Sequence, residues 1–207
     1  MQKMNILAVG AHPDDIEFGC GGALIKYADR GHHLYLLIMT EGGLGGAPET
    51  RVAEQTAARD ILGAREIYWG DYSDTFLQVA KDIITKVEDV IDRVQPDLIF
   101  CHYPDDTHQD HRHLAQAVIS ATRYIRNVLF YEGPTTQNFN PQIYVDISDT
   151  LERKIEALEA HRSQVDKTNI EDLTILELAR STGNFRGTQG RVKFAEAFSA
   201  LRLFINI

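Results

Sequence analysis

Short apolar runs alternate with stretches of helical periodicity along this chain, and this alternation restricts the fold more than any other feature. The run LYLLIMT, residues 34–40, is apolar almost throughout, as is typical of a strand covered on both faces of a sheet. The tail from Ser148 onward is expected to be mainly helical. The other predicted strands are 4–9, 66–69, 97–101, 128–131 and 143–147, and the predicted helices are 16–30, 49–62, 79–94 and 111–127. We therefore expect a single-domain, Rossmann-like α/β fold in which helices cover both faces of a mostly parallel sheet.

The length and composition of the chain restrict the number of domains, the partners and the compartment that we expect. Its 207 residues suit one domain, residues 1–207, and 43% hydrophobic with 25% charged residues is ordinary for a globular protein. A formal net charge of −9 offers no basic surface for phosphates, so we expect no nucleic-acid partner. No run is long enough to span a membrane, and the first apolar run breaks at Gly10, too early for a signal peptide. Because Cys20 and Cys101 are far apart and fit no disulfide framework, we expect a cytoplasmic protein. The sequence leaves the formation of a homo-oligomer open.

Polar clusters follow the first four predicted strands, each at the point where a strand ends. Ligands of open α/β sheets bind beyond the carboxyl ends of the strands, because parallel strands all end at one edge. The clusters are HPDD at 12–15, TEGG at 40–43, Asp71 with Asp74, and HYPDDTHQDH at 102–111. Their common position predicts one site built from four separate segments.

Two histidines and one carboxylate from these clusters suit a catalytic metal. His12 and Asp15 lie three residues apart across a tight turn, and His111 is the natural third ligand at the start of the next helix. Such a set leaves an open position for water, unlike a closed structural site. Zn2+ fits it best, although Fe2+ or another divalent metal uses the same ligands. We expect a bound water whose pKa falls to roughly 7, and we expect His102 to line the pocket without binding the metal.

Three further polar residues beside these ligands suit proton transfer. Asp14 neighbours a ligand without being one, and a carboxylate near the bound water can accept its proton. His108 can donate to a developing oxyanion or to a leaving amine, and Asp110 can hold its imidazole. The alternative is structural, since aspartates often cap helices and Asp14 or Asp15 precedes the predicted helix at 16–30.

The segments AHPDDIEFGCGG (11–22) and HYPDDTHQDHRHL (102–114) together resemble the LmbE-like, or PIG-L-like, family of metal-dependent N-acetylglucosamine deacetylases. The likeness continues in TEGGLG, RVAEQTAARDILGA, EALEAHRSQ and AEAF. It implies removal of an N-acetyl group from a small amino-sugar substrate, with release of acetate and a free amine. The roles that the resemblance implies are metal ligands His12, Asp15 and His111, base Asp14, and acid or oxyanion stabiliser His108 with its support Asp110.

Substrate contacts are expected from the segments after the second and third strands. The resemblance associates Arg51, in the helix at 49–62, with substrate binding, and we expect Glu41 and the glycine-rich segment after it to close on the sugar. Asp74 matches a family position that often meets sugar hydroxyls, with a plain turn role as its alternative. Gln109 departs from the family, where many members carry proline, and it touches no proposed chemical group.

Two other functions fit parts of the same pattern. Gly19, Gly21 and Gly22, with Glu41 as a ribose-binding acid, would suit a nicotinamide dinucleotide-binding enzyme. These glycines fall inside the predicted helix instead of the turn before it, so close packing of helix on sheet is the simpler reason for them. A metal- or sugar-binding protein without turnover is the second alternative.

Overall fold

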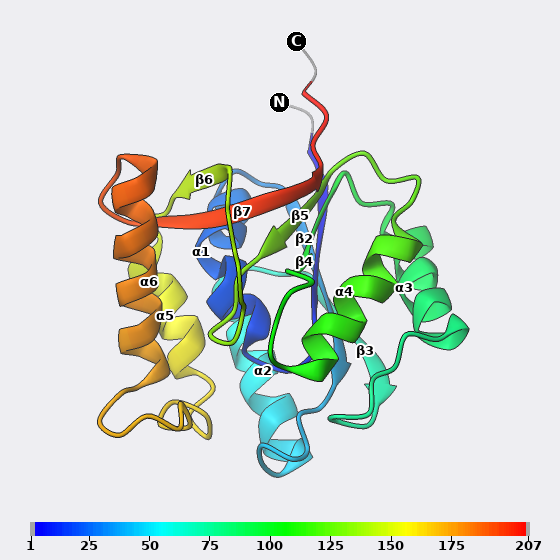
Figure 1. The fold of residues 1–207 in the computed structure, drawn as a ribbon, viewed down its shortest axis with the longest axis horizontal. Coiled ribbons are helices and arrows are strands. Elements are labelled where there is room, and N and C mark those ends of the chain that lie inside the picture. Colours follow the sequence, from blue (N-terminus) through cyan, green and yellow to red (C-terminus); the bar gives the residue numbers. More distant parts are fainter. Residues whose placement is uncertain (1–2, 206–207) are drawn as a thin grey trace.

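The computed structural model describes residues 3–205, and the predicted alternation of strands and helices is present in it (Figure 1). The strands are β1 (Asn5–Gly10), β2 (His33–Thr40), β3 (Glu66–Tyr72), β4 (Leu98–His102), β5 (Val128–Tyr131), β6 (Ile143–Asp146) and β7 (Ala195–Arg202). The helices are α1 (Asp15–Asp29), α2 (Pro48–Leu62), α3 (Lys81–Val94), α4 (Gln109–Ala121), α5 (Leu151–Glu159) and α6 (Ile175–Gly190). Residues 1–2 and 206–207 of the predicted domain lie outside the described residues. Between residues 3 and 205, no helix has the length and apolar character needed to cross a membrane.

The strands of the described residues form one seven-stranded sheet in the order β3-β2-β1-β4-β5-β7-β6. β1 is parallel to β2 on one side and to β4 on the other, so the direction in which the chain adds strands reverses at β1. This is the topological switch point, beyond which α/β sheets bind their ligands. The first five strands run parallel, which confirms the predicted sheet.

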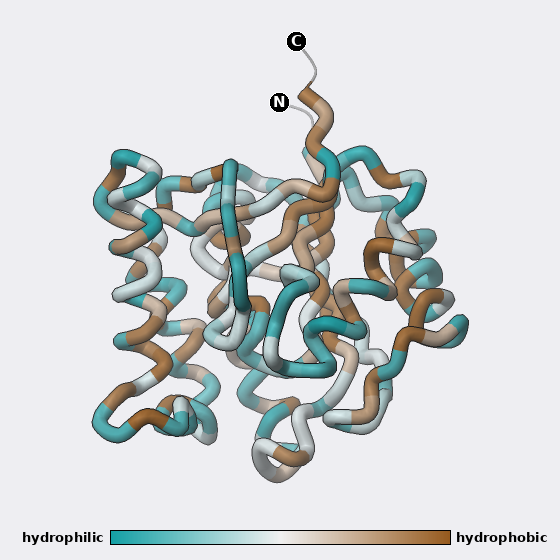
Figure 2. Tube along the Cα trace, viewed as in Figure 1, coloured by the Kyte–Doolittle hydropathy of each residue, from teal (hydrophilic) through white to brown (hydrophobic). Residues whose placement is uncertain are grey.

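Helices cover both faces of the sheet, as predicted. Figure 1 shows α3 and α4 on one side, and α1, α5 and α6 on the other. The apolar stripe of α3 packs with Val9, Ile99 and other residues of the central strands, while Leu24 and Ile25 of α1 pack on the opposite face. Figure 2 shows largely brown central strands, and helices along which teal and brown residues alternate.

The glycines of α1 allow the helix to lie directly on the sheet. A Cβ atom on Gly19 would lie 2.1 Å from the ring of Tyr131, and one on Gly22 would lie 2.9 Å from Ile147. Tyr131 is fully buried, and its hydroxyl donates to the carbonyl oxygen of Val9 at 2.8 Å. Helix packing therefore explains these glycines, as the sequence predicts, and they lie outside the turn where a dinucleotide loop belongs.

The tail beyond Ser148 ends in a strand, β7, instead of continuing as helix. β7 lies between β5 and β6 and is antiparallel to both. The sequence of β7 does not indicate a buried strand, because it contains Glu196 and glutamate is rarely buried. In the structure Glu196 is nevertheless only 4% exposed. Glu196 accepts hydrogen bonds from the main-chain N–H groups of Gly22 and Ala23 and pairs with Lys154 Nζ at 2.6 Å. Its burial is thus compensated by partners that the local pattern does not reveal.

Other element boundaries also differ from the predictions. β3 continues to Tyr72, so Asp71 belongs to the strand and not to the segment after it. α4 ends at Ala121 instead of residue 127. After this end, the Thr122 hydroxyl donates to the carbonyl of Val118 at 2.7 Å, and Arg202 donates to the carbonyl of Thr122. α3 begins at Lys81, two residues later than predicted.

Candidate active site

The HPDD turn joins β1 to α1 at the topological switch point. Asp14 has a left-handed φ of 86°, a strained conformation for a residue other than glycine. Two side chains of α2 hold this turn: Gln55 Oε1 accepts from the Asp14 N–H at 3.3 Å, and Arg51 Nη2 donates to the Pro13 carbonyl at 2.7 Å. As a result Asp14 and Asp15 both line the cavity at the carboxyl edge of the sheet.

The three predicted metal ligands come together around the carboxylate of Asp15. Asp15 Oδ2 lies 3.4 Å from His12 Nδ1, and Asp15 Oδ1 lies 3.3 Å from His111 Nε2. The main-chain N–H of His12 donates to Asp15 Oδ2 at 2.7 Å and fixes the carboxylate in this position. Although burial opposes ionisation, His111 and His102 hold the pKa of Asp15 well below its usual range. Two imidazoles on either side of an ionised carboxylate form a donor set suited to a divalent cation.

His102 adds a further imidazole to this region. Within each of three overlapping groups, one donor atom per residue lies within 4.8 Å of the others, and among the described residues each group contains at most two of the predicted ligands: His12, His108 and His111; Asp15, His102 and His111; and His12, Asp74 and Asp110. His102 Nε2 lies 3.2 Å from Asp15 Oδ2 but accepts a hydrogen bond from the Ala11 N–H at 3.1 Å. Burial and the nearby His111 lower the pKa of His102 to about 4, so its ring is neutral. It forms the wall behind Asp15, where the sequence predicts a pocket residue.

Asp106, to which the sequence assigns no role, lies directly behind His111. Its Oδ2 is 3.3 Å from His111 Nδ1. The carboxylate also accepts from the hydroxyls of Thr135 and Thr136 at 2.6 and 2.9 Å and from the His108 N–H at 2.8 Å. Although burial opposes ionisation, His111 and Thr135 hold the pKa of Asp106 far below its usual range. A carboxylate behind a metal-binding histidine fixes the tautomer and the orientation of its ring.

We expect Asp106→Asn to weaken metal binding by about 10- to 100-fold, because a neutral amide attracts the His111 ring, whose Nδ1 lies 3.3 Å from Asp106 Oδ2, less strongly than a carboxylate does. Competition with a coloured chelator measures this affinity. The matched control is Asp105→Asn, since Asp105 is exposed and its carboxylate accepts from Asn138 Nδ2 at 2.8 Å, away from the histidines. Equal metal affinity in both variants would show that Asp106 does not orient His111.

Asp14 occupies the N-cap position of α1, yet among residues 3–205 its side chain finds no main-chain N–H to cap. Its Oδ2 instead accepts from Arg51 Nη1 at 3.2 Å. Burial raises the pKa of Asp14, and the Arg51 guanidinium offsets part of that rise. A carboxylate at the cavity surface with a raised pKa suits a general base better than a helix cap.

A buried polar network lies behind Asp14 and was not expected from the sequence. Gln55 Nε2 donates to Glu17 Oε1 at 2.7 Å, and Glu17 Oε2 faces His161 Nε2 at 3.7 Å. Each of these three side chains is at most 1% exposed. Burial opposes a charged His161, but Glu17 raises the pKa of that imidazole. The network ties the HRSQ segment, residues 161–164 after α5, to the turn that carries Asp14.

His108 occupies the N-cap position of α4 and presents a proton donor to the site. Its Nδ1 accepts a hydrogen bond from the Asp110 main-chain N–H at 3.2 Å, so the proton of the neutral ring lies on Nε2. Burial and the neighbouring His111 lower the pKa of His108, which favours this neutral form. His108 lines the cavity and is therefore available to a bound carbonyl oxygen.

The side chain of Asp110 lies elsewhere than its predicted role implies. Its carboxylate is 3.2 Å from His12 Nε2 and accepts from the N–H groups of Thr75 and Leu77 at 2.8 and 3.3 Å. Asp110 therefore supports His108 through its main chain, while its carboxylate joins His12 to the segment after β3.

The three predicted substrate-binding residues have different surroundings. Arg51 lines the cavity but is only 3% exposed, because its guanidinium contacts the HPDD turn. Asp74 also lines the cavity, with Oδ1 at 3.1 Å from His12 Nε2 and Oδ2 accepting from the Leu44 N–H at 2.9 Å. Glu41 is exposed and lies outside the cavity lining.

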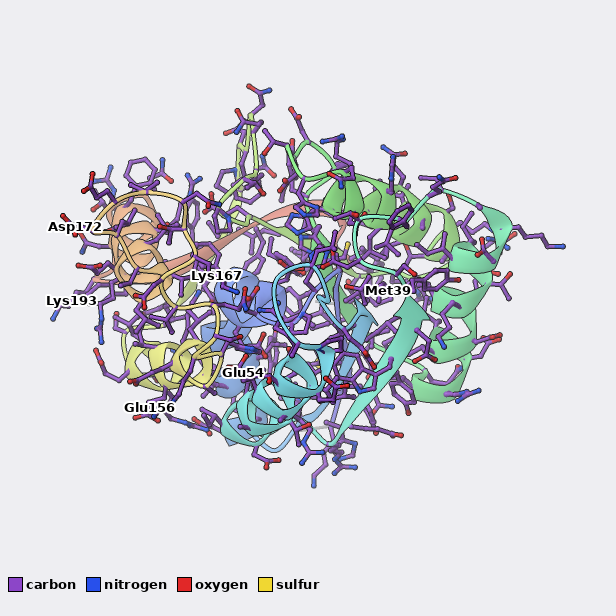
Figure 3. All side chains as sticks on the ribbon, turned by 90° about the horizontal axis from the view of Figure 1, so that it is seen from below. Met39, Glu54, Glu156, Lys167, Asp172 and Lys193 are labelled. Atoms are coloured by element: carbon purple, nitrogen blue, oxygen red, sulfur yellow. The ribbon has the colours of Figure 1, made fainter. Side chains whose placement is uncertain are left out.

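The cavity has a volume of about 510 Å³, within the roughly 300–1,000 Å³ usual for small-molecule sites. Figure 3 looks onto this edge of the molecule and labels Glu54 and Lys167, which anchor the segment between α5 and α6. Glu54 of α2 accepts from the N–H and hydroxyl of Ser163, both at 2.7 Å, and Lys167 Nζ donates to the carbonyl of Gly45. This segment therefore forms one wall of the cavity.

Residues 7–122 match the family model described as PIG-L: GlcNAc-PI de-N-acetylase. The chain belongs to the PIG-L family. The matched residues run from β1 to the end of α4 and contain every predicted metal, catalytic and substrate-binding residue. The reaction of this family is hydrolytic N-deacetylation, so the chain is an enzyme of that class.

Individual relatives agree with the family. The protein named Uncharacterized deacetylase YaiS from Escherichia coli strain K12 is 35% identical over 172 residues, which is 78% of this chain and 92% of the relative. Diacetylchitobiose deacetylase from Thermococcus kodakarensis is 27% identical over 190 residues, covering 77% of this chain and 69% of the relative. The crystal structure of the conserved protein TT1542 from Thermus thermophilus matches with a TM-score of 0.88 at 26% identity, over 99% of this chain and 97% of that one.

Proposed function

We propose that this PIG-L family member is a zinc-dependent hydrolase that removes the N-acetyl group from an N-acetylglucosaminyl compound. The observation that carries the proposal is the Asp15 carboxylate between His12 and His111, with Asp14 beside it in the same cavity. The relative named for diacetylchitobiose supports a small N-acetylated amino sugar as the substrate class. The buried free thiols of Cys20 and Cys101 suit the reducing cytoplasm that we propose as its compartment.

The residues at the site fit a bound divalent metal. The two oxygens of Asp15 face one ring nitrogen each of His12 and His111, and Asp106 holds the far side of the second ring. Two imidazoles and a carboxylate suit Zn2+, and Fe2+ is the main competitor for the same ligands. When bound, such a metal supplies a Lewis acid for the acetyl carbonyl and a water of lowered pKa.

The other groups of the site supply proton transfer. Asp14 accepts the proton of the attacking water, because its carboxylate lines the cavity and Arg51 orients it. His108 donates its Nε2–H to the acetyl oxygen as negative charge develops there. Asp14 or His108 then returns a proton to the departing nitrogen, which leaves as the free amine while the added water oxygen stays in acetate.

The test is a deacetylation assay on protein loaded with Zn2+. N-acetylglucosamine, its methyl glycoside and diacetylchitobiose are incubated with the enzyme, and acetate and primary amine are both measured. We expect the two products in equal amounts, at a rate that falls after chelation and returns when Zn2+ is restored. Sugar binding without acetate release would contradict the proposal and identify a binding protein without turnover.

A further inference from the structure

The active-site cavity has an apolar wall that the proposed chemistry does not use. Phe18 of α1 and Ile175 and Leu178 of α6 line this wall. Ile175 and Leu178 are three residues apart on one face of α6, and both pack against the core cluster that contains Phe18. The main-chain N–H of Phe18 donates to the carbonyl of Asp14 at 3.0 Å. The apolar wall therefore begins one helical turn from the proposed base.

Two aliphatic side chains at the mouth of the same cavity are exposed. Leu44, in the glycine-rich segment after β2, is 73% exposed, and Ile170, in the segment before α6, is 59% exposed. The segment before α6 is partly brown in Figure 2 although it lies at the periphery of the molecule. Gln164 Nε2 donates to the Gly45 carbonyl at 3.2 Å and thus joins the two segments. Exposed aliphatic residues around a pocket are typical of a binding surface.

The cavity lining carries two permanent positive charges, and one of them is paired with a carboxylate. Among the described residues that line the cavity, the arginine and lysine side chains are Arg51 and Lys167. Arg51 donates to Pro13 and Asp14, and Lys167 donates to the carbonyl of Gly45. The charge of Arg51 is thus compensated by the Asp14 carboxylate, whereas Lys167 keeps two N–H donors, and the carboxymethyl glycoside in the test below probes whether they bind an anionic substituent.

We propose that the amino sugar carries an apolar aglycone, alkyl or aryl, that binds against Phe18, Ile170, Ile175 and Leu178. The inference rests on the proposed function. In that function the acetamido group binds beside Asp14 and the metal ligands, and its position determines where the rest of the substrate lies. Each methylene that becomes fully buried strengthens binding roughly fourfold. The wall thus selects among N-acetylglucosaminides by the hydrocarbon surface of the aglycone.

The test compares four N-acetylglucosaminides on the Zn2+-loaded full chain: the methyl, hexyl and carboxymethyl glycosides and diacetylchitobiose. We expect kcat/KM for the hexyl glycoside to exceed that for the methyl glycoside by at least about tenfold, because several added methylenes are buried. The carboxymethyl glycoside and diacetylchitobiose should not exceed the methyl glycoside. Ile170→Ser should lower the hexyl-to-methyl ratio by about threefold or more. Leu203→Ser is the matched control, since Leu203 is 46% exposed, follows β7 and is not part of the cavity lining, so this variant should leave the ratio unchanged.

Equilibrium binding gives a second readout that does not require turnover. Hexyl glucosaminide, which lacks the acetyl group, should bind more tightly than methyl glucosaminide, and Ile170→Ser should reduce the difference. The apolar subsite would be overturned if the hexyl and methyl compounds had nearly equal kcat/KM and nearly equal Kd. It would also be overturned if Ile170→Ser left the hexyl-to-methyl ratio unchanged. Higher kcat/KM for the carboxymethyl glycoside or for diacetylchitobiose would overturn it in favour of an anionic or a sugar aglycone. Tighter hexyl binding without acetate release from any glycoside would support the subsite and overturn the deacetylation.

Discussion

Asp14→Asn is expected to leave a folded, metal-loaded protein whose kcat is lower by at least about a hundredfold. Asparagine has nearly the shape of aspartate, so Arg51 and Gln55 still hold the turn, and the three metal ligands remain. The variant lacks the carboxylate that accepts a proton from the attacking water. The Asp14 carboxylate interacts with the proton of the attacking water mainly in the transition state. The KM for the substrate should therefore change little. Metal content, Tm and kcat are measured on one preparation.

An aspartate-to-asparagine substitution at an exposed position serves as the control for Asp14→Asn. Asp149 has a side chain that is 66% exposed and pairs with Lys26, so Asp149→Asn should keep normal turnover. A helix cap at Asp14 would predict a different result, a loss of roughly 1 kcal/mol in stability with near-normal kcat. Near-wild-type turnover of Asp14→Asn would mean that the base is assigned to the wrong residue.

The double variant His12→Ala, His111→Ala is expected to bind almost no Zn2+ and to release no measurable acetate. It removes two of the three imidazoles near the Asp15 carboxylate, and Asp15 with His102 alone does not supply the three protein ligands usual for a catalytic zinc site. Elemental analysis after dialysis measures the bound metal, and circular dichroism shows whether the variant is folded. Both histidines face the cavity, so we expect the sheet and its helices to remain.

A second pair of histidines provides the control for the loss of imidazoles. His32 and His33 lie at the start of β2, at the opposite edge of the sheet, so His32→Ala, His33→Ala should keep its full metal content. Full retention of metal by the His12 and His111 variant would place the metal elsewhere. His102 is then the first candidate, because its Nε2 is 3.2 Å from Asp15.

Several parts of the fold and site were predictable because they depend on local pattern. Continuous apolar runs such as residues 34–40 mark buried strands, and their alternation with helices leads to a parallel sheet. In such a sheet the strand ends share one edge, so His12 and His111 were expected to meet although 99 residues separate them. The structure brings both to Asp15. The resemblance of the HPDD and HQDH motifs to the PIG-L family predicts the same two histidines.

Other features depended on partners from distant segments and were missed or misplaced. β7 was missed because Glu196 is tolerated in a buried strand only through Lys154 and the amide groups of α1. The carboxylate of Asp110 was expected at His108, but the segment after β3 supplies N–H donors that attract it. No local signal places Glu41 outside the cavity while Asp74 lies inside it.

The sequence by itself determined the order of the elements and the chemical groups at the strand ends, because strand and helix periodicity and the HPDD and HQDH motifs are local properties. The tertiary structure alone decided which groups support these residues. Asp106 reaches His111 within one segment but is fixed by Thr135 and Thr136, while Gln55, Glu17 and His161 meet from three separate elements. A polar side chain is stable in the interior only where its hydrogen-bonding partners converge, and that convergence exists only once the helices have packed on the sheet.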